Sequence, residues 1–526
     1  MKLRRRRAVD RWLVRLSVPI VVMLVASGCT SGRATPAVAE SPTVAVTTSS
    51  PAQYQPAYSV VACDGPLFAG RLSGTATGAE CGTLTVPEDR SKVSGRQVVL
   101  PVAILRSTDP NKRADPYVYF SGGPGDGGIE SGGRLLDAGL VPTDRDFIWF
   151  DQRGTGRAAP SLNCPETLEA LYRRFESLDD PSVEDGRAVS ALDACVQRLR
   201  PTADLTQYDT PTTARDVTDL RRALGIDEWN IFGISYGTTV ALEVLRSQSS
   251  GVRSAVIDSV FPSFVPDGLG SVVSSADRVF KKLFDGCAAD AACRERYPNF
   301  KADAEGIVTQ LDATPYHLSY ADDAGVQRAA NLTGQDLMSA LYMALYRSTL
   351  IPLIPSFVDQ IKHGDFSVLD LVGSQLLPAL AGNSDGVTYS VECADRQSIS
   401  TSSDITALRK AHPLYGAVLS RPSVPQDCPT MHVPSVVRAF NEVPRTRIPT
   451  LVFGDEYDPV TPPQDSAETA RRLGPKATFV LFPGLGHGAT SAADCPRQIF
   501  RAFLDDPTAK VDTACVGSMT PPHWSV

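Results

Sequence analysis

The chain has 526 residues, of which 42% are hydrophobic and 21% charged, and this balance is ordinary for a globular protein. Its formal net charge is −8, and the body of the chain has no basic cluster, which argues against nucleic acid as a partner. A chain of this length can form a large core and more than one folding unit.

The first 28 residues have the layout of an exported bacterial lipoprotein. Lys2 and Arg4–Arg7 form a charged start, and Leu16–Val25 is an apolar stretch too short to span a bilayer comfortably. The small residues Ala-Ser-Gly before Cys29 resemble a lipobox. We therefore expect a signal peptide over 1–28 and lipidation of Cys29, which would anchor the chain to the outer face of the cytoplasmic membrane. Ordinary signal cleavage with an incidental Cys29 is the alternative.

Residues 29–55 are expected to form a flexible tether. They are mostly Ser, Thr, Ala and Pro, with almost no charged or large apolar side chains. Such a segment cannot bury enough surface to fold. The sequence thus predicts a membrane anchor, a tether and then a folded body.

The cysteines support export. Ten remain after Cys29, and an even number in an exported chain favours disulfides. Sequence alone does not fix the connectivity, and pairing of nearest neighbours in chain order is the simplest arrangement. No Cys-x-x-Cys pair or His/Cys cluster has the spacing of a zinc site, so we expect neither a metal nor a cofactor. The ten are Cys63, Cys81, Cys164, Cys195, Cys287, Cys293, Cys393, Cys428, Cys495 and Cys515.

Short β-type runs alternate with helical patterns over residues 56–262, the first part of the predicted core. Thr210 and Pro211 begin one helix, with Thr210 as its N-cap, and Gly225 ends it. This alternation predicts a mostly parallel, doubly wound α/β sheet. The runs are Cys81–Val86, Gln97–Leu105, Tyr117–Phe120, Phe147–Phe150 and Ala255–Asp258.

Residues 263–430 interrupt this rhythm with helical patterns and no strong buried strand. The patterns cover Ala276–Cys287, Leu337–Tyr346 and Ile361–Leu371. The sheet pattern resumes within residues 431–526, at Pro449–Phe453 and Thr478–Phe482. We therefore expect a helical cap inserted late in the sheet, in preference to a second independent domain.

The most informative stretch is Trp229–Gly237. An apolar run meets Gly-Ile-Ser235-Tyr-Gly, and a helical pattern follows at once. A nucleophile elbow has this strand–turn–helix context, and its sharp turn requires glycine on both sides, here Gly233 and Gly237. The stretch predicts Ser235 as a nucleophile.

A serine hydroxyl needs a base, and the base needs an orienting acid. Asp458 follows the predicted strand ending at Phe453, and His487 follows the strand ending at Phe482. Ligands bind at this edge of parallel sheets. The order Ser235, Asp458, His487 is that of the α/β-hydrolases, with Asp455 as the alternative acid.

The developing oxyanion needs backbone N–H donors, each contributing roughly 3 kcal/mol in known hydrolases. We expect one from Tyr236, directly after the nucleophile. The other is expected from the loop Ser121-Gly-Gly-Pro-Gly125, where Gly122 and Gly123 allow close backbone approach.

Five motifs together resemble one enzyme family over residues 60–515. The chain is similar to the proline iminopeptidase and tripeptidyl aminopeptidase family of α/β-hydrolases, in particular its secreted actinobacterial and mycobacterial branch. Proline iminopeptidases usually have His where this chain has Ser121. The chain is therefore more similar to the tripeptidyl branch, where this position varies, and a strict preference for proline is not expected. The motifs are Ser-Gly-Gly-Pro-Gly, Asp-Gln-Arg-Gly-Thr-Gly, Gly-Ile-Ser-Tyr-Gly-Thr, Asp-Pro-Val-Thr-Pro and Gly-His-Gly.

The resemblance implies a serine peptidase that hydrolyses a peptide bond near a free N-terminus, with Ser235, Asp458 and His487 as its triad. It also implies Glu392 and Asp395 as carboxylates for the substrate amine, while solvated acids beside a disulfide are an equally good interpretation. Arg153, in the second motif, is interpreted as structural.

Two other functions remain open on the sequence. The same triad serves a carboxylesterase or lipase acting on small esters, because a triad does not choose between ester and amide. A non-catalytic envelope binding protein on the same scaffold is the second alternative.

Overall fold

The computed structural model describes residues 54–526, except 66, 71, 73–77, 140, 265–267, 374–376, 378–381, 397–423 and 437–441. The predicted signal peptide, Cys29 and nearly all of the predicted tether lie outside the described residues. Within the described part of the chain, no helix combines the length and the apolar character that a membrane span requires.

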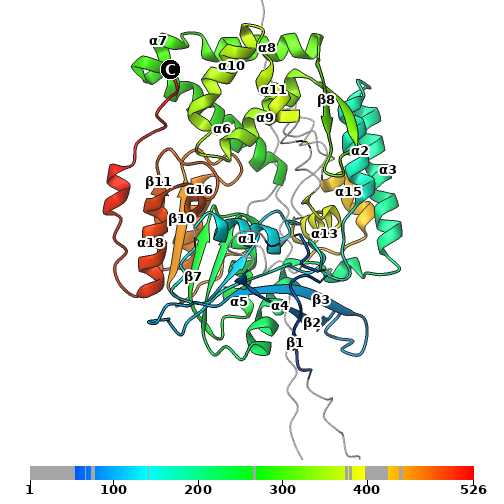
Figure 1. Ribbon diagram of the computed structural model, residues 1–526, viewed down its shortest axis with the longest axis vertical. Coiled ribbons are helices and arrows are strands. Elements are labelled where there is room, and N and C mark those ends of the chain that lie inside the picture. Colours follow the sequence, from blue (N-terminus) through cyan, green and yellow to red (C-terminus); the bar gives the residue numbers. More distant parts are fainter. Residues whose placement is uncertain are drawn as a thin grey trace, which may run out of the picture. The chain divides into compact units, whose positions relative to one another are not determined.

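A mixed sheet lies at the centre of the body (Figure 1). At one edge of the sheet, β1, β2, β3 and β5 pair antiparallel with one another in that order. From β5 to the other edge, every neighbouring pair of strands is parallel. The predicted doubly wound α/β sheet is therefore confirmed. Across the described residues its nine strands are ordered β1 (Ala57–Val60), β2 (Glu80–Pro87), β3 (Gln97–Leu105), β5 (Phe147–Phe150), β4 (Tyr117–Phe120), β6 (Trp229–Ile234), β7 (Val252–Asp258), β10 (Thr450–Asp455) and β11 (Ala477–Phe482).

The central strands are buried throughout because helices cover both faces of the sheet. Every residue of β4, β5, β6 and β10 is buried. Along β4, Val118 and Phe120 point into one apolar core, and Tyr117 and Tyr119 into the other. Helices α4 (Thr210–Ala223), α5 (Tyr236–Ser247) and α16 (Pro463–Leu473) pack on the first face, and α1 (Gly128–Asp137) and α18 (Asp494–Asp505) on the second.

The predicted helix at 210–225 is present, but its predicted N-cap is wrong. Asp209 is the N-cap, and its side chain accepts a hydrogen bond from the Thr212 backbone N–H at 2.7 Å. Thr210 lies inside the first turn, before Pro211. Its hydroxyl is therefore available to side chains of other elements.

The predicted cap has its own apolar core above the sheet (Figure 1). The cap is mostly helical, but it also contains an antiparallel hairpin that was not predicted, formed by β8 (Tyr316–Ala321) and β9 (Gln327–Leu332). Exposed and half-buried residues alternate along most of β8, so it lacks the continuous apolar run of a buried strand. Among its helices are α6 (Gly268–Ala289), α7 (Ala291–Arg296), α8 (Phe300–Ala313), α9 (Gly334–Leu345), α10 (Ile354–Lys362) and α11 (Ser367–Leu371).

The third predicted cap helix, Ile361–Leu371, is interrupted. Helix α10 ends at Lys362 and α11 begins at Ser367, with Gly364 between them at φ 85°. Glycine adopts this backbone conformation readily, so the chain turns at Gly364. The apolar spacing that predicted one helix therefore runs across a turn between two helices.

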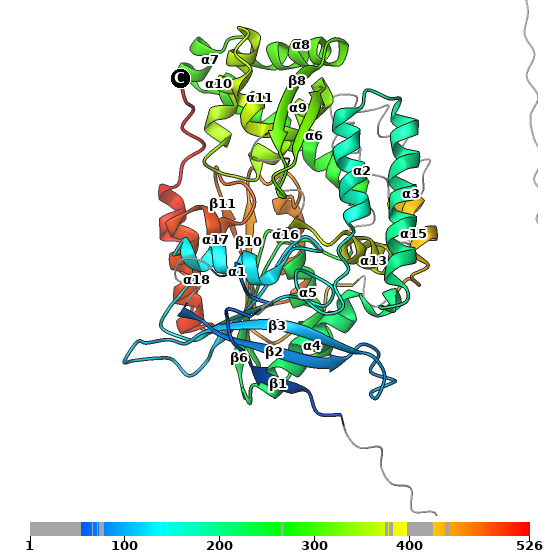
Figure 2. The same cartoon turned by 45° about the vertical axis from the view of Figure 1, so that its right-hand side comes forward.

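Two further helices, α2 (Pro165–Glu176) and α3 (Pro181–Leu199), run side by side next to the hairpin (Figure 2). Tyr172 of α2 belongs to the apolar core of the cap. Arg328 of β9 forms an ion pair with Glu169 of α2 at 2.8 Å. The cap is therefore packed against a segment that precedes the elbow in the chain.

Among the described residues, five disulfides join nearest neighbours in chain order, which confirms the simplest pairing. Their sequence separations run from six to 35 residues, and three of them lie in the cap and its flanking helices. The bonds are Cys63–Cys81, Cys164–Cys195, Cys287–Cys293, Cys393–Cys428 and Cys495–Cys515.

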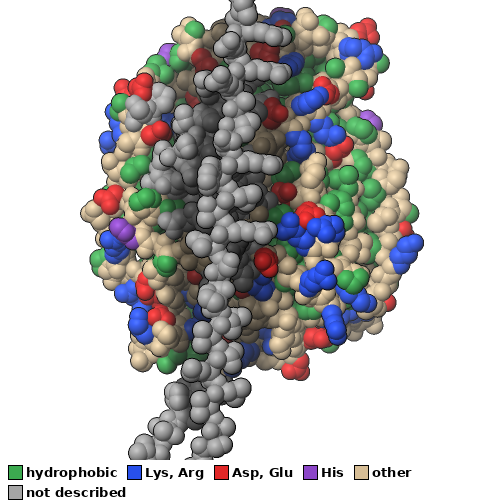
Figure 3. Space-filling model, turned by 180° about the vertical axis from the view of Figure 1, so that it is seen from behind, with side chains coloured by type: hydrophobic (Ala, Val, Ile, Leu, Met, Phe, Trp, Pro, Cys, Tyr) green, Lys and Arg blue, Asp and Glu red, His purple; other side chains and the backbone are tan. Residues whose placement is uncertain are grey.

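Side chains of both charges are interspersed on the described part of the face shown in Figure 3. Exposed ion pairs such as Arg471–Glu468 contribute little to stability, because water screens them.

Arg153 forms a different kind of ion pair, because it is buried and binds Asp216 through two hydrogen bonds of 2.6 and 2.7 Å. It also donates to the Gln207 carbonyl at 2.7 Å, so its contacts are those of a structural residue.

Candidate active site

Ser235 lies on the sharp turn between β6 and α5. Its φ of 58° and ψ of −127° are strained for a residue with a side chain. A Cβ atom on Gly237 would lie 2.1 Å from the Phe120 carbonyl oxygen, and one on Gly233 would lie 2.3 Å from the Gly237 carbonyl oxygen. Only glycine fits either position, so the structure has the close approach that the elbow motif predicts.

Asp458 and His487 meet beyond the carboxyl ends of β10 and β11. His487 Nδ1 lies 2.8 Å from Asp458 Oδ2. The other carboxylate oxygen, Oδ1, accepts backbone N–H groups from Val460 and Thr461 at 2.9 and 2.8 Å. Because Nδ1 faces a carboxylate, it carries the proton, and Nε2 remains available as a base.

This contact shifts the pKa values of both groups. Burial alone would raise the pKa of Asp458, but the charge and hydrogen bond of His487 outweigh it and lower that pKa. Burial alone would lower the pKa of His487, but the charge and hydrogen bond of Asp458 raise it, with smaller contributions from Asp258 and Asp126. Asp458 is therefore ionised at neutral pH and oriented toward the imidazole.

Thr461 also belongs to this group, and the sequence analysis missed it. Its hydroxyl donates to Asp458 Oδ2 at 2.5 Å and lies 3.3 Å from His487 Nδ1. The only signal in the sequence is its place three residues after the acid, where a side chain can fold back on a carboxylate. Thr461 thus holds the Asp458 carboxylate in place, and that carboxylate orients the His487 imidazole.

Asp455, the alternative acid, has a different place. Its Oδ2 accepts hydrogen bonds from Ser259 Oγ at 2.8 Å and from the Ala489 backbone N–H at 3.1 Å. The same N–H also lies 3.1 Å from Asp258 Oδ1. Burial, together with the charge of Asp258, raises the pKa of Asp455 well above its ordinary value. The two carboxyl groups thus hold the backbone just after His487.

The Ser121–Gly125 loop lies against the elbow. A Cβ atom on Gly122 would stand 3.1 Å from Ser235 Cβ and 3.6 Å from its Oγ. The next residue, Gly123, has φ 105°, which permits the turn into Pro124. The buried Gln152 side chain donates to the Ser121 carbonyl and hydroxyl oxygens, both at 3.0 Å. Gly122 is therefore next to the serine, and the donor roles of Gly122 and Gly123 stay a prediction.

The two candidate amine ligands lie on α13 (Asp385–Arg396), a helix of the predicted cap. Glu392 is half-buried. Asp395 is buried, and its Oδ2 accepts a hydrogen bond from Thr210 Oγ1 at 2.6 Å. Thr210 Oγ1 in turn lies 2.8 Å from the Tyr236 hydroxyl oxygen. Asp395 is thus connected with the elbow through side chains.

The cap also contacts the histidine loop. The His487 backbone N–H donates to the Tyr346 carbonyl at 3.1 Å, and the Tyr346 ring centroid lies 5.0 Å from that of the imidazole. The Gly486 N–H donates to Ser348 Oγ at 2.9 Å. The cap therefore forms one wall of the site.

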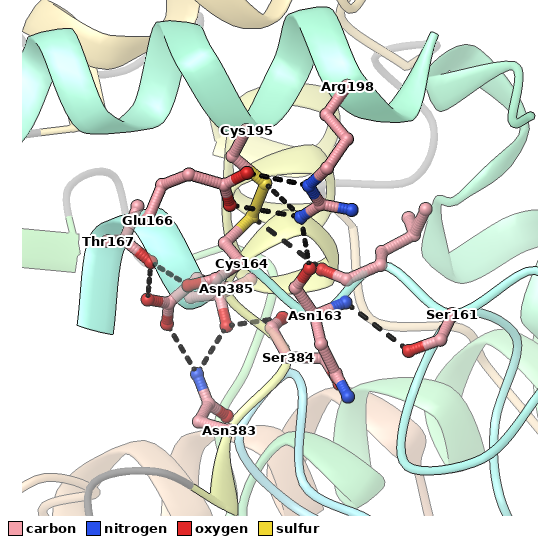
Figure 4. The surroundings of a disulfide bond; sticks show 12 residues. Ser161, Asn163, Cys164, Glu166, Thr167, Cys195, Arg198, Asn383, Ser384 and Asp385 are labelled. Carbon is pink, nitrogen blue, oxygen red and sulfur yellow. Dashed lines mark hydrogen bonds and ion pairs between the residues drawn. A yellow bond between two sulfur atoms is a disulfide. The ribbon is translucent and has the colours of Figure 1, made fainter. Parts of the chain in front are cut away.

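A cluster of Cys164, Glu166 and Cys195 has the residue types of a metal site. Figure 4 shows that the two sulfurs are bonded to each other, and Arg198 binds Glu166 at 2.6 Å. Disulfide sulfurs are not thiolates, and only thiolates bind metals strongly. The cluster is therefore a structural one that joins α2 and α3.

Comparison with known proteins agrees with this geometry. A family model described as the alpha/beta hydrolase fold matches residues 116–490. The chain is 24% identical to a tripeptidyl aminopeptidase of Streptomyces lividans, over 84% of both chains. It is 25% identical to the serine protease Hip1 of Mycobacterium tuberculosis, over 85% of this chain and 86% of that one. It is also 28% identical to a carboxylesterase B of the same species, over 83% of this chain and 86% of that one.

The raised pKa of His487 predicts the pH dependence of activity. The base works only when neutral, so kcat/KM should rise with pH through a midpoint above the ordinary histidine value of 6.5. Asp458→Asn removes the group that raises this pKa, so the midpoint should fall and kcat should drop about 10⁴-fold. Steady-state kinetics from pH 5 to 9 measure both effects.

Asp455→Asn is the matched control. The substitution keeps one oxygen acceptor and removes no contact of the imidazole, so kcat should stay within about tenfold of the wild type, because about one hydrogen bond is at stake. Inactivation by Asp455→Asn together with an active Asp458→Asn would assign the acid to Asp455 and contradict this prediction.

Proposed function

We propose that this chain, which belongs to the α/β-hydrolase fold family, is a serine hydrolase with aminopeptidase activity. It would cleave peptides near a free N-terminus. The observation that favours an aminopeptidase is the contact between α13 and the Ser121–Gly125 loop. Thr388 Oγ1 of α13 donates to the Pro124 carbonyl at 2.6 Å. The helix that carries both candidate amine ligands, Glu392 and Asp395, therefore packs directly on the loop next to the nucleophile.

In the proposed mechanism, His487 Nε2 removes the Ser235 Oγ proton, and Oγ attacks the substrate carbonyl. Asp458 holds the imidazole and stabilises its protonated form. The Tyr236 and Gly123 N–H groups bind the oxyanion. The imidazolium then protonates the leaving amine, and water activated by the same histidine releases the acyl group from Ser235.

An aminopeptidase also has to bind the ammonium of its substrate, and α13 supplies candidate carboxylates. Glu392 and Asp395 are three residues apart, close to one helical turn. Asp395 is already hydrogen-bonded to Thr210 in the interior, whereas Glu392 is half-buried. We therefore assign the amine-binding role to Glu392.

A carboxylesterase is the second candidate function, because a relative of similar identity and coverage has that name. The triad serves both reactions, so only the substrate decides between them. Amine recognition is the property that separates the two.

A substrate profile tests the proposal. An N-terminally free tripeptide p-nitroanilide, its N-acetylated form and p-nitrophenyl butyrate would be compared. We expect kcat/KM for the free peptide to exceed that for the acetylated one by roughly 10–100-fold, because a hydrogen bond to a charged group contributes about 1.5–3 kcal/mol. Glu392→Gln should raise KM for the free peptide and leave the ester unchanged.

Ser235→Ala is the control, and it should abolish turnover of all three substrates. Equal cleavage of free and acetylated peptide, with the ester as the best substrate, would contradict the aminopeptidase and favour the carboxylesterase.

We also propose that Cys29 is lipidated and that the enzyme acts outside the cytoplasm. The signal-like residues 1–28 and the small residues before Cys29 support this, as do five disulfides, which persist in oxidising compartments. The lipid would tether the body to the outer face of the cytoplasmic membrane.

Detergent partitioning of the full chain, expressed in a bacterium that processes lipoproteins, tests the anchor. The wild type should enter the detergent phase, and the intact mass of the mature protein should include the acyl chains on Cys29. Cys29→Ala should leave the protein in the aqueous phase. Equal partitioning of the two proteins, without an added lipid mass, would contradict the anchor.

A further inference from the structure

We propose that α13 positions both halves of the oxyanion hole, and that Asp395 is the positioning residue for Tyr236 and not a ligand of the substrate amine. The inference rests on the proposed function, in which Tyr236 and the Ser121–Gly125 loop supply the oxyanion donors. It goes beyond that function by giving the cap a role in transition-state stabilisation.

Three buried side chains form the first half of the argument. Thr210 Oγ1 donates its single proton to Asp395 Oδ2 at 2.6 Å. The Tyr236 hydroxyl oxygen lies 2.8 Å from Thr210 Oγ1, so Tyr236 must be the donor in that second bond. The three residues are 0%, 3% and 2% exposed for Thr210, Asp395 and Tyr236. Water therefore does not compete for these bonds.

The position of Tyr236 gives this chain of bonds its consequence. Tyr236 is the first residue of α5, directly after Ser235, and its backbone N–H is the predicted oxyanion donor. The hydrogen bond of the Tyr236 hydroxyl fixes the far end of the ring. It thereby restrains the turn that carries both Ser235 and the Tyr236 backbone N–H. Preorganised donors are effective because they need no reorientation when charge develops.

The same helix holds the other half of the oxyanion hole. Thr388 Oγ1 donates to the Pro124 carbonyl at 2.6 Å, and the Ser384 backbone N–H donates to the Gly125 carbonyl at 3.0 Å. Thr388 precedes Asp395 by seven residues, which is two helical turns, so the two side chains lie on one face of α13. That face thus contacts both the glycine loop and the chain of bonds to the elbow.

α13 is itself fixed at both ends. Near its start, Thr167 Oγ1 donates to Asp385 Oδ2 at 2.6 Å, and Ser384 Oγ donates to Asn163 Oδ1 (Figure 4). Near its end, Cys393 is bonded to Cys428. A helix held in this way can act as a fixed support for the donors.

Tyr236→Phe, Thr210→Val and Asp395→Asn test the proposal, with the free tripeptide p-nitroanilide and p-nitrophenyl butyrate as substrates. Tyr236→Phe keeps the backbone N–H and removes one oxygen atom, so it remains informative if the other variants do not fold. We expect each variant to lower kcat about tenfold on both substrates, with KM within about twofold, because one buried hydrogen bond is lost.

The double variant Thr210→Val/Asp395→Asn should be no slower than the slower single variant, because both remove the same chain of bonds. Thr210→Ser should restore kcat, because it keeps the hydroxyl. Thr333→Val is the matched control: it removes a threonine-to-aspartate hydrogen bond of equal length, from Thr333 Oγ1 to Asp336 Oδ2, at the start of another helix, α9. Its kcat should equal that of the wild type.

Two results would overturn the proposal. If Asp395→Asn raises KM for the free peptide and leaves the ester unaffected, Asp395 binds the amine. If the three variants lower the melting temperature as Thr333→Val does but leave kcat unchanged, the chain of bonds is merely structural. Failure of the aminopeptidase proposal is seen separately, as equal cleavage of free and acetylated peptide, and the ester measurement then still decides the role of Asp395.

Discussion

The strained turn at Ser235 is the feature on which the rest of the structure depends. A residue with a side chain at φ 58° costs on the order of 1–3 kcal/mol, so the surroundings must hold it there. β6 is buried at every position, and the Ser235 N–H donates to the Asp258 carbonyl at 3.1 Å. Gly237 approaches the Phe120 carbonyl so closely that no other residue fits. The sheet and α5 together thus fix the backbone position from which the Ser235 side chain projects.

The parallel strands β6, β7, β10 and β11 bring the carboxyl ends of β10 and β11 to the same edge of the sheet as that turn. The end of β10 supplies Asp458, the end of β11 supplies His487, and buried carboxyl groups below them hold the backbone that follows the histidine. The cap contributes from above, through Tyr346 and through the contacts of α13. The histidine is thus held by a carboxylate, a loop and a cap wall, and its raised pKa reflects mainly the carboxylate.

Most of the sheet and the elbow could be predicted from the sequence, because their signals are local. Apolar runs such as Tyr117–Phe120, and glycines on both sides of Ser235, are required by the structure at those positions. The hairpin of the cap was missed because its residues alternate in burial. The roles of Thr210 and Asp395 could not be predicted, because they arise only where α4, α5 and the cap meet.

Labelling with a fluorophosphonate probe tests the central claim most directly, since the probe bonds to an activated serine and releases fluoride. We predict one adduct in the intact mass of the wild type, located by peptide mapping at Ser235, absent from Ser235→Ala and formed far more slowly in Asp458→Asn. A wild type that does not react, or that carries the same adduct as Ser235→Ala, would contradict the assignment of Ser235 as the nucleophile.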